Sequence, residues 1–284
     1  ALDAHIADPE HNPAILVDTE GIQHSSYTPA TPGWAYVGNT DWLDEFYRKS
    51  AFMQQHNASL SGGTERNNYY ASIGYKDQSG IFRYGNDSYK RFNLSFNFDT
   101  KITDWLDMSF STRMSNIKND EPYMDNGGSD AVTWYYEVYR MYPTLSVFLP
   151  NGDFAGIYLN GGNYNIIGKM ALAGRNKKET WDQWYTGRFD LHPMKGLSVK
   201  GDYSWNRYST VQKFHRKEMT QTFPEGRDPY LVETPNYVRN YNSNNIYQAI
   251  NVWAEYKKSF NDVHNLSLMA GYNQEEKTYA STSY

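Results

Sequence analysis

A group of aromatic side chains near the middle of the chain is the strongest candidate for binding chemistry. Rings that carry a polar group at one end suit sugar rings and peptide side chains, because they combine apolar contact with a hydrogen-bonding atom. The same rings could instead pack their loop against the rest of the molecule or against a partner protein that covers it. Helical spacing would turn part of the set inward. The candidate substrate-binding residues are Trp134, Tyr135, Tyr136, Tyr139 and Tyr142.

No other group of residues has the spacing of a catalytic, metal or cofactor site. The sequence contains no H-E-x-x-H, G-x-S-x-G, P-loop or dinucleotide-binding motif, so we expect neither enzymatic activity nor a cofactor. The histidines are scattered, and His192 and His264 lie in predicted turns. Asp125, Asn126 and Asp130 could offer oxygen atoms to Ca²⁺, but their spacing differs from that of an EF-hand loop. We therefore expect an ordinary polar loop there and no metal site.

The composition excludes several classes of protein. The 284 residues carry a formal net charge of -5, which argues against non-specific binding of nucleic acid. The absence of cysteine excludes disulfides and thiolate metal sites. No apolar run approaches the roughly 18 residues of a transmembrane helix. Residues 1–20 lack the pattern of a signal peptide, so we expect an exported chain that is processed or incomplete.

Alternation of apolar and polar residues dominates the rest of the sequence. The clearest run places Phe92, Leu94, Phe96 and Phe98 between Asn93, Ser95 and Asn97. Because successive side chains of a strand point to opposite faces, such a run predicts one face on lipid and the other facing a polar lumen. Similar runs predict eight strands, at about 51–61, 67–77, 90–99, 105–116, 180–191, 197–208, 245–257 and 264–276.

The connections between these strands alternate between short and long. The turns at 62–66 and 192–196 are tight, whereas the segments 118–178 and 207–244 are long. Outer-membrane β-barrels alternate in this way, with short periplasmic turns and long extracellular loops. The sequence therefore predicts an all-β fold, a section of a transmembrane antiparallel β-barrel over 51–284, preceded by an extracellular loop over 1–50. A soluble β-sandwich would also give alternating strands and remains an alternative.

Two helices are predicted outside the strands. Thr40 is the expected N-cap of a short helix over 41–47. The segment 118–178 is too long for a structureless connection, and we expect a helix from about Asp130 to Met141 that Pro143 ends.

The direction of the strands predicts that the barrel continues beyond this chain. If the short turns are periplasmic, both ends of the chain lie outside the cell, whereas complete single-chain barrels normally keep their termini on the periplasmic side. We therefore expect a section of a larger barrel. Eight strands could also close by themselves. In that case the chain would be a small outer-membrane barrel with adhesive or ligand-binding loops.

Several stretches of the sequence resemble the SusC/RagA family of TonB-dependent transporters. The similarity covers most of the chain and is most specific between Asn39 and Leu94. The matching stretches are 39–46, 56–65, 68–75, 77–81, 89–94, 196–200, 264–266 and 270–272.

This resemblance implies a barrel of about 22 strands in the outer membrane of Bacteroidetes. Such a transporter imports oligosaccharides or oligopeptides and pairs with a SusD-like surface lipoprotein that closes over the barrel. It also implies that TonB supplies energy through an N-terminal plug region, which has no counterpart in this sequence. The implied partners are thus the SusD-like lipoprotein, TonB, outer-membrane lipid and a glycan or peptide substrate.

Overall fold

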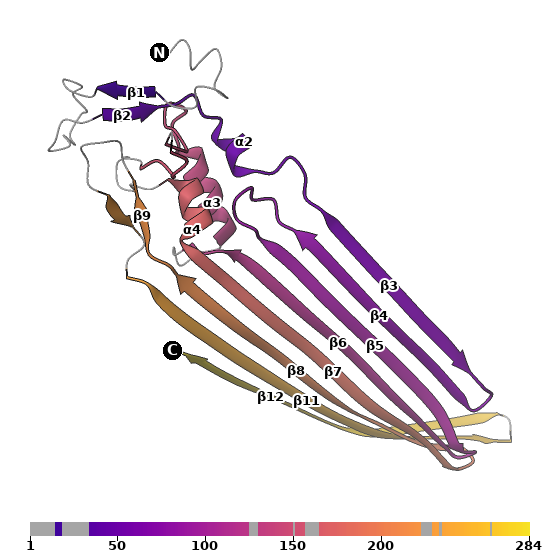
Figure 1. Cartoon of the computed structure of the whole chain (residues 1–284). Coiled ribbons are helices and arrows are strands. Elements are labelled where there is room, and N and C mark those ends of the chain that lie inside the picture. Colours follow the sequence, from indigo (N-terminus) through magenta and orange to yellow (C-terminus); the bar gives the residue numbers. More distant parts are fainter. Residues whose placement is uncertain are drawn as a thin grey trace.

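Eight long strands form one antiparallel sheet in the computed structural model, which describes residues 15–18, 34–124, 130–149, 151–156, 165–222, 229–232, 235–261 and 263–284. Each strand pairs with the neighbouring strand of this sheet along the chain (Figure 1). The predicted all-β fold and the predicted number of strands are confirmed. The strands are β3 (Met53–Gly63), β4 (Asn67–Ser79), β5 (Ser88–Thr103), β6 (Leu106–Pro122), β7 (Gly174–Met194), β8 (Leu197–Arg216), β11 (Tyr237–Phe260) and β12 (His264–Ser283).

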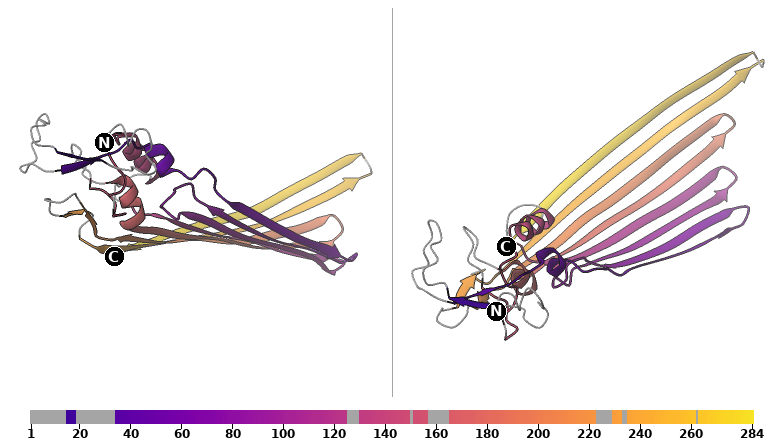
Figure 2. Two further views of the ribbon diagram at one scale, coloured as in Figure 1. Left: turned by 45° about the horizontal axis from the view of Figure 1, so that its top comes forward. Right: turned by 90° about the horizontal axis from the view of Figure 1, so that it is seen from above.

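The sheet is open. Its order runs from β12 at one edge to β3 at the other, and these two edge strands do not pair with each other. Figure 2 shows the sheet as a curved wall. The closed eight-stranded barrel considered from the sequence is therefore wrong for this structure. Unpaired strand edges leave backbone groups without partners, which is costly in lipid, so further strands are needed to complete a membrane barrel.

All the short connections lie at one end of the sheet and all the long ones at the other (Figure 1). The short turns join β3 to β4, β5 to β6, β7 to β8 and β11 to β12. The opposite end is called the loop end below, and its described residues include three helices and two small pairs of antiparallel strands. These are α2 (Trp42–Phe46), α3 (Asp130–Tyr139), α4 (Ile166–Leu172), β1 (Ile15–Asp18) with β2 (Trp34–Val37), and β9 (Met219–Gln221) with β10 (Tyr230–Val232).

Several strands extend further toward the loop end than the sequence pattern indicated. β7 begins at Gly174 rather than near 180, and β11 begins at Tyr237 rather than near 245. The added residues are mostly polar on both faces, so they show no apolar alternation. Backbone pairing nevertheless continues there, for example between Lys177 and Lys213. Within the described residues, no helix is long and apolar enough to cross a membrane.

The two predicted helices form with different boundaries, and the first has a different N-cap. Asp41, not Thr40, caps α2, because its Oδ1 accepts hydrogen bonds from the backbone N–H groups of Leu43 and Asp44, at 3.0 and 3.1 Å. The Thr40 hydroxyl instead donates to the carbonyl of Leu145 at 2.6 Å. α3 ends at Tyr139, before the expected end at Met141.

The register of the strands separates two faces of the sheet. Phe96 lies opposite Ala71 on β4 and Thr112 on β6, and its ring centroid is 6.5 Å from that of Phe110. On the other face, the Ser115 hydroxyl donates to Asn93 Oδ1 at 3.0 Å. The alternation predicted for β5 thus produces an apolar face, which contains Phe96, and a polar face, which contains Asn93.

The apolar residues form a band that crosses the strands obliquely. On β5 the last ring of the band toward the loop end is Phe92, and the row of paired residues through Phe92 reaches β12 at Ala280. On β12 the corresponding ring is Tyr272, eight residues from Ala280 toward the short turns. This drift of about 26 Å along the strands occurs over about 24 Å across them, which corresponds to a strand tilt of about 45°. Transmembrane barrel strands are inclined to the membrane by a similar angle.

Candidate binding surface at the loop end

The candidate aromatic residues lie on and just after α3, where the structure divides them into a buried part and an exposed part. Trp134 is 1% exposed, whereas Tyr136 and Tyr139 are 59% and 71% exposed. Tyr135 and Tyr142 are also exposed. Helical periodicity explains the division, since Trp134 and Val138 are four positions apart and face the core together.

Trp134 belongs to a hydrophobic core at the loop end. Its ring centroid lies 6.3 Å from that of Phe46 on α2 and 6.1 Å from that of Phe82. The same core includes Ile167 and Met170 of α4. The inclusion of Trp134 among surface contacts is therefore corrected: in this structure its ring packs the loops together and is not accessible to a ligand.

The four exposed tyrosines, Tyr135, Tyr136, Tyr139 and Tyr142, are called the tyrosine patch below. The Arg140 guanidinium lies 5.0 Å from the centre of the Tyr136 ring, and the Glu137 carboxylate lies 3.5 Å from Arg140. These contacts orient one ring of the patch while leaving it exposed. Rings fixed in this way lose little conformational freedom when they bind a ligand.

Tyr47 lies at the margin of the tyrosine patch. Its ring centroid is 6.2 Å from that of Tyr135. Burial, together with the neighbouring Tyr135 and Tyr139, raises the pKa of Tyr47 to about 12. The hydroxyl is therefore neutral at physiological pH and acts as a hydrogen-bonding group rather than as a charge.

Residues before α2 fasten the segment that carries the patch. The backbone N–H groups of Gly38 and Thr40 donate to the carbonyls of Thr144 and Pro143, both at 2.8 Å. The indole N–H of Trp42 donates to the carbonyl of Tyr142 at 2.8 Å. The end of the patch is thus fixed by a part of the chain about 100 residues away.

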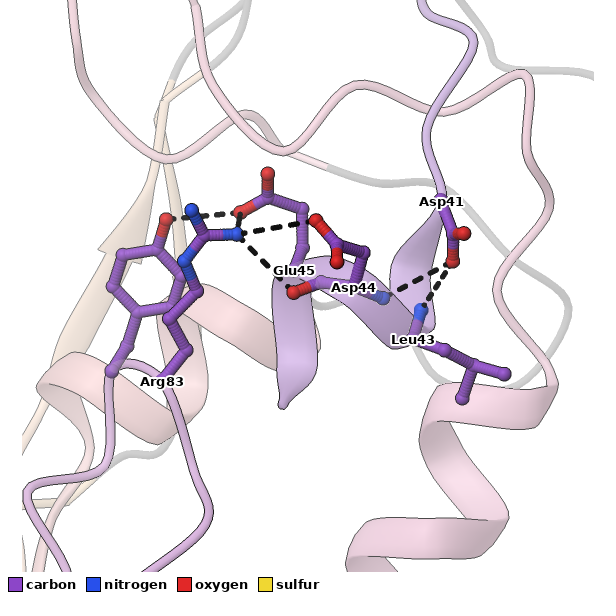
Figure 3. Close-up of polar contacts among 6 residues, drawn as sticks. Asp41, Leu43, Asp44, Glu45 and Arg83 are labelled. Atoms are coloured by element: carbon purple, nitrogen blue, oxygen red, sulfur yellow. Dashed lines mark hydrogen bonds and ion pairs between the residues drawn. The ribbon is translucent and has the colours of Figure 1, made fainter. Parts of the chain in front are cut away.

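The other end of α2 is tied to the connection between β4 and β5 (Figure 3). Arg83 Nη1 lies 3.4 Å from Glu45 Oε2 and donates to the carbonyl oxygen of Asp44 at 3.2 Å. The Tyr84 hydroxyl donates to Glu45 at 2.9 Å. Burial and this hydrogen bond raise the pKa of Tyr84. These ionic and hydrogen-bonding contacts join α2 to the connection between β4 and β5.

Asn165 organises the centre of the loop end, and the sequence analysis missed it. Its Oδ1 caps α4 by accepting from the N–H groups of Ile167 and Gly168, both at 3.1 Å. Its side-chain amide donates to the carbonyls of Val147 and Ala155, at 2.8 and 3.0 Å. An asparagine directly before an apolar run is an N-cap signal, so part of this role could have been found.

Arg175 at the start of β7 joins β6 to the β4–β5 connection. Its Nη2 lies 2.7 Å from Asp120 and donates to the carbonyl of Asn86 at 3.0 Å, and its Nη1 donates to the carbonyl of Gly85. The preceding Gly174 has φ +110°, and a Cβ there would lie 2.0 Å from the carbonyl oxygen of His215. Only glycine can bring Arg175 into this position without strain.

We expect Arg175→Met to loosen the β4–β5 connection by about 2 kcal/mol, because Asp120 and two carbonyls lose their main donor. Hydrogen exchange at residues 81–87 measures this effect. Lys177→Met is the matched control, since Lys177 contacts the same carboxylate at 3.4 Å but is mostly exposed. Equal protection in the two variants would contradict the proposed role of Arg175.

The charged residues of the polar face pair with neighbouring side chains. Lys200 Nζ lies 2.9 Å from Asp190, and His192 Nε2 lies 3.1 Å from the same carboxylate. The Arg113 guanidinium lies 5.8 Å from the centre of the Trp184 ring. Among the residues that the structure describes, no three His, Asp or Glu side chains gather into a metal-binding group. Asp125 and Asn126, considered above for Ca²⁺, lie outside the described residues.

Comparison with known proteins identifies relatives that are similar in sequence. The chain is 25% identical over 246 residues to TonB-dependent receptor P3 of Formosa agariphila, a match that covers 84% of this chain and 23% of the relative. It is 34% identical over 102 residues to TonB-dependent receptor SusC of Bacteroides thetaiotaomicron, covering 36% of this chain and 9% of SusC. No protein-family model matches the chain.

Solved structures with a similar fold are those of the RagAB peptide importer. The RagAB peptide importer in the 'closed-closed' state superposes with a TM-score of 0.63 and 24% identity, covering 86% of this chain and 27% of the matched chain. The 'open-open' state of the same importer gives a TM-score of 0.62 and 25% identity. The chain thus spans about a quarter of the length of TonB-dependent receptor P3 and of the matched RagAB chain.

The open sheet of long tilted strands and these similarities define the class: the chain is a section of an outer-membrane β-barrel. Within that class, its sequence is similar to TonB-dependent receptors, SusC among them, and its fold is similar to that of the RagAB importer.

Proposed function

We propose that this chain forms part of a TonB-dependent transporter that imports oligosaccharides or oligopeptides together with a SusD-like lipoprotein. The observation that carries the proposal is the sequence match to a TonB-dependent receptor over 84% of the chain. The solved RagAB complexes are peptide importers, which supports the oligopeptide class, whereas the oligosaccharide class rests on the family resemblance of the sequence. Transport, energy from TonB and the partnership belong to the whole protein.

In this proposal the apolar face contacts lipid and the loop end lies outside the cell. The oblique drift of the apolar band supports it, because tilted strands that cross a flat membrane must show such a drift. Aromatic rings lie in the loop-side part of the band: Tyr185 and Trp205 have ring centroids 5.5 Å apart, and Trp181 lies four positions beyond Tyr185 on the same face of β7. Amphipathic rings of this kind are enriched where barrels meet the membrane interface.

The tyrosine patch is the proposed contact surface for the substrate. Its rings are exposed, the Tyr136 ring is oriented by Arg140, and all four lie on the longest described connection at the loop end. Their hydroxyls can hydrogen-bond to sugar hydroxyls or peptide groups while the ring faces provide apolar contact. The same rings would serve equally well as anchors for a lipoprotein lid.

Tyr136→Ala combined with Tyr139→Ala should weaken ligand capture by the complete transporter by roughly tenfold, because two exposed ring contacts are lost. Uptake of labelled oligosaccharide or peptide and the amount of surface protein are measured together. Phe52→Ala is the control, since Phe52 is an exposed ring before β3 and outside the patch. If only association with the lipoprotein fails, the patch is an interface. If both ligand uptake and lipoprotein binding persist, the proposed role of the patch is wrong.

A further inference from the structure

Aromatic rings gather on one half of the polar face of the sheet. Along the described strands β3 to β6 this face carries two rings, Tyr70 and Tyr89, whereas along β7, β8, β11 and β12 it carries eight. The wall of a barrel lumen is ordinarily polar, and none of these rings belongs to the hydrophobic core at the loop end. That core therefore does not explain why they gather here. The eight rings are Trp184, Tyr208, Phe214, Tyr237, Tyr241, Tyr247, Trp253 and Tyr279.

Trp184 and Tyr247 form the centre of this group. Both are register partners of Asn206, so they lie on either side of it in one row across β7, β8 and β11. Their ring centroids are 6.0 Å apart, with an interplanar angle of 56°. Asn206 is 7% exposed, and its amide donates to Asp182 Oδ1 at 2.7 Å and to the carbonyl of Gln183 at 3.0 Å. The two rings thus lie against a fixed base and lose little conformational freedom when they bind a ligand.

Further rings extend from this pair along the strands in both directions. Tyr208 and Tyr279 lie in the next row of this face toward the loop end. The Tyr241 hydroxyl lies 3.0 Å from that of Tyr279, and Trp253 lies six positions from Tyr247 toward the short turns. From Trp253 to Tyr241 the rings extend over about 40 Å of β11. The group called the aromatic track below consists of Trp184, Tyr208, Tyr241, Tyr247, Trp253 and Tyr279.

The charged side chains beside the central pair balance one another. Arg113 lies in the same row on β6, with its guanidinium 5.8 Å from the centre of the Trp184 ring, and Lys277 lies in this row on β12. Asp182 and Glu275 lie two positions away on the same face of β7 and β12. The two cations and the two carboxylates give no net charge here. The surroundings of the pair therefore do not attract a ligand of either charge.

We propose that the aromatic track binds an uncharged oligosaccharide on its way through the lumen. The inference rests on the proposed transport function, because the polar face lines a lumen only if the sheet is part of a barrel wall. Sugar rings stack on aromatic side chains, and their hydroxyls can hydrogen-bond to tyrosine hydroxyls. A glycan presents a similar ring at every unit, so repeated aromatic contacts suit it. Peptide side chains differ from residue to residue. The track therefore favours the oligosaccharide class over the oligopeptide class.

The test measures ligand binding by the complete transporter, purified in mild detergent. The probes are maltohexaose, cellohexaose, mannohexaose and xylohexaose, the corresponding disaccharides, and a random hexapeptide library. We expect a hexasaccharide to bind roughly tenfold more tightly than its disaccharide, because it contacts more rings of the track. If no hexasaccharide binds, the proposal is overturned. Uptake of the same probes by cells separates this result from a failure of the proposed function, since a transporter that imports peptides but binds no hexasaccharide contradicts the aromatic track alone.

Trp184→Leu with Tyr247→Leu should weaken binding of the hexasaccharide by roughly 30-fold, because the apolar volume is largely kept while two stacking rings are lost. Trp184→Phe with Tyr247→Phe keeps both rings and should retain most of the binding. Tyr70→Leu with Tyr89→Leu is the matched control, because it removes two rings from the polar face of β4 and β5. Binding that persists after the leucine changes at Trp184 and Tyr247, or an equal loss in the control, would overturn the proposal.

Discussion

Phe96→Arg should destabilise the membrane-inserted protein by about 2–4 kcal/mol, the cost of a cationic side chain on the lipid face near the centre of the bilayer. Phe96 lies well inside the apolar band, between Leu94 and Phe98, with Phe110 beside it. An arginine there would have to bend toward an interface or draw water into the bilayer. The midpoint of reversible unfolding by urea in phospholipid vesicles, measured on the complete protein, gives this change.

The adjacent position supplies the control for Phe96→Arg. Asn97 is exposed on the polar face, one residue further along β5. Asn97→Arg adds the same charge at almost the same depth but faces the lumen in the proposed orientation, so we expect a change within about 0.5 kcal/mol. The reverse order of the two variants would show that the faces are assigned the wrong way round. Equal effects would favour a soluble sheet.

Trp134→Ala should destabilise the loop end by about 3–5 kcal/mol, the usual cost of removing a large buried ring. The buried indole packs against the rings of Phe46 and Phe82. We expect α2, α3 and the β4–β5 connection to lose protection together. Hydrogen exchange resolved by segment detects this loss while the long strands stay protected.

Tyr139→Ala is the matched comparison for Trp134→Ala, because it removes a ring from the exposed side of the same helix. Exposed positions of this kind usually change stability by less than about 0.5 kcal/mol. If the loop end stays stable after Trp134→Ala and only ligand capture is lost, Trp134 contacts the ligand and is not a core residue.

The strands were predictable from sequence where one face is apolar and the other is polar. β5 shows this clearly, since its rings and amides alternate and its pairing places them on opposite faces. The same reasoning did not predict the first residues of β7. Asn176, Lys177 and Lys178 point to alternate faces of the sheet, and all three are polar. Hydrogen bonding between backbones continues through such residues, and a pattern based on hydrophobicity cannot detect it.

The candidate site was predictable only in part. The spacing of rings on α3 indicated that some would turn inward, yet the sequence could not say which face meets the core. That choice depends on Phe46 and Phe82, which are distant along the chain and reach Trp134 only through the tertiary fold. The role of Asn165 also depends on carbonyls supplied by two separate segments. Long-range contacts of this kind leave no periodic pattern in the sequence.

Cysteine labelling in intact cells tests the membrane orientation most directly, because these 284 residues contain no cysteine and a single thiol can be introduced at a chosen position. Tyr139→Cys places a thiol at the loop end, and Lys195→Cys places one in the short turn between β7 and β8. With a membrane-impermeant maleimide applied from outside, we predict labelling of Tyr139→Cys and protection of Lys195→Cys until the outer membrane is opened. Labelling of Lys195→Cys in intact cells, with Tyr139→Cys protected, would contradict an outer-membrane barrel whose long loops face the exterior.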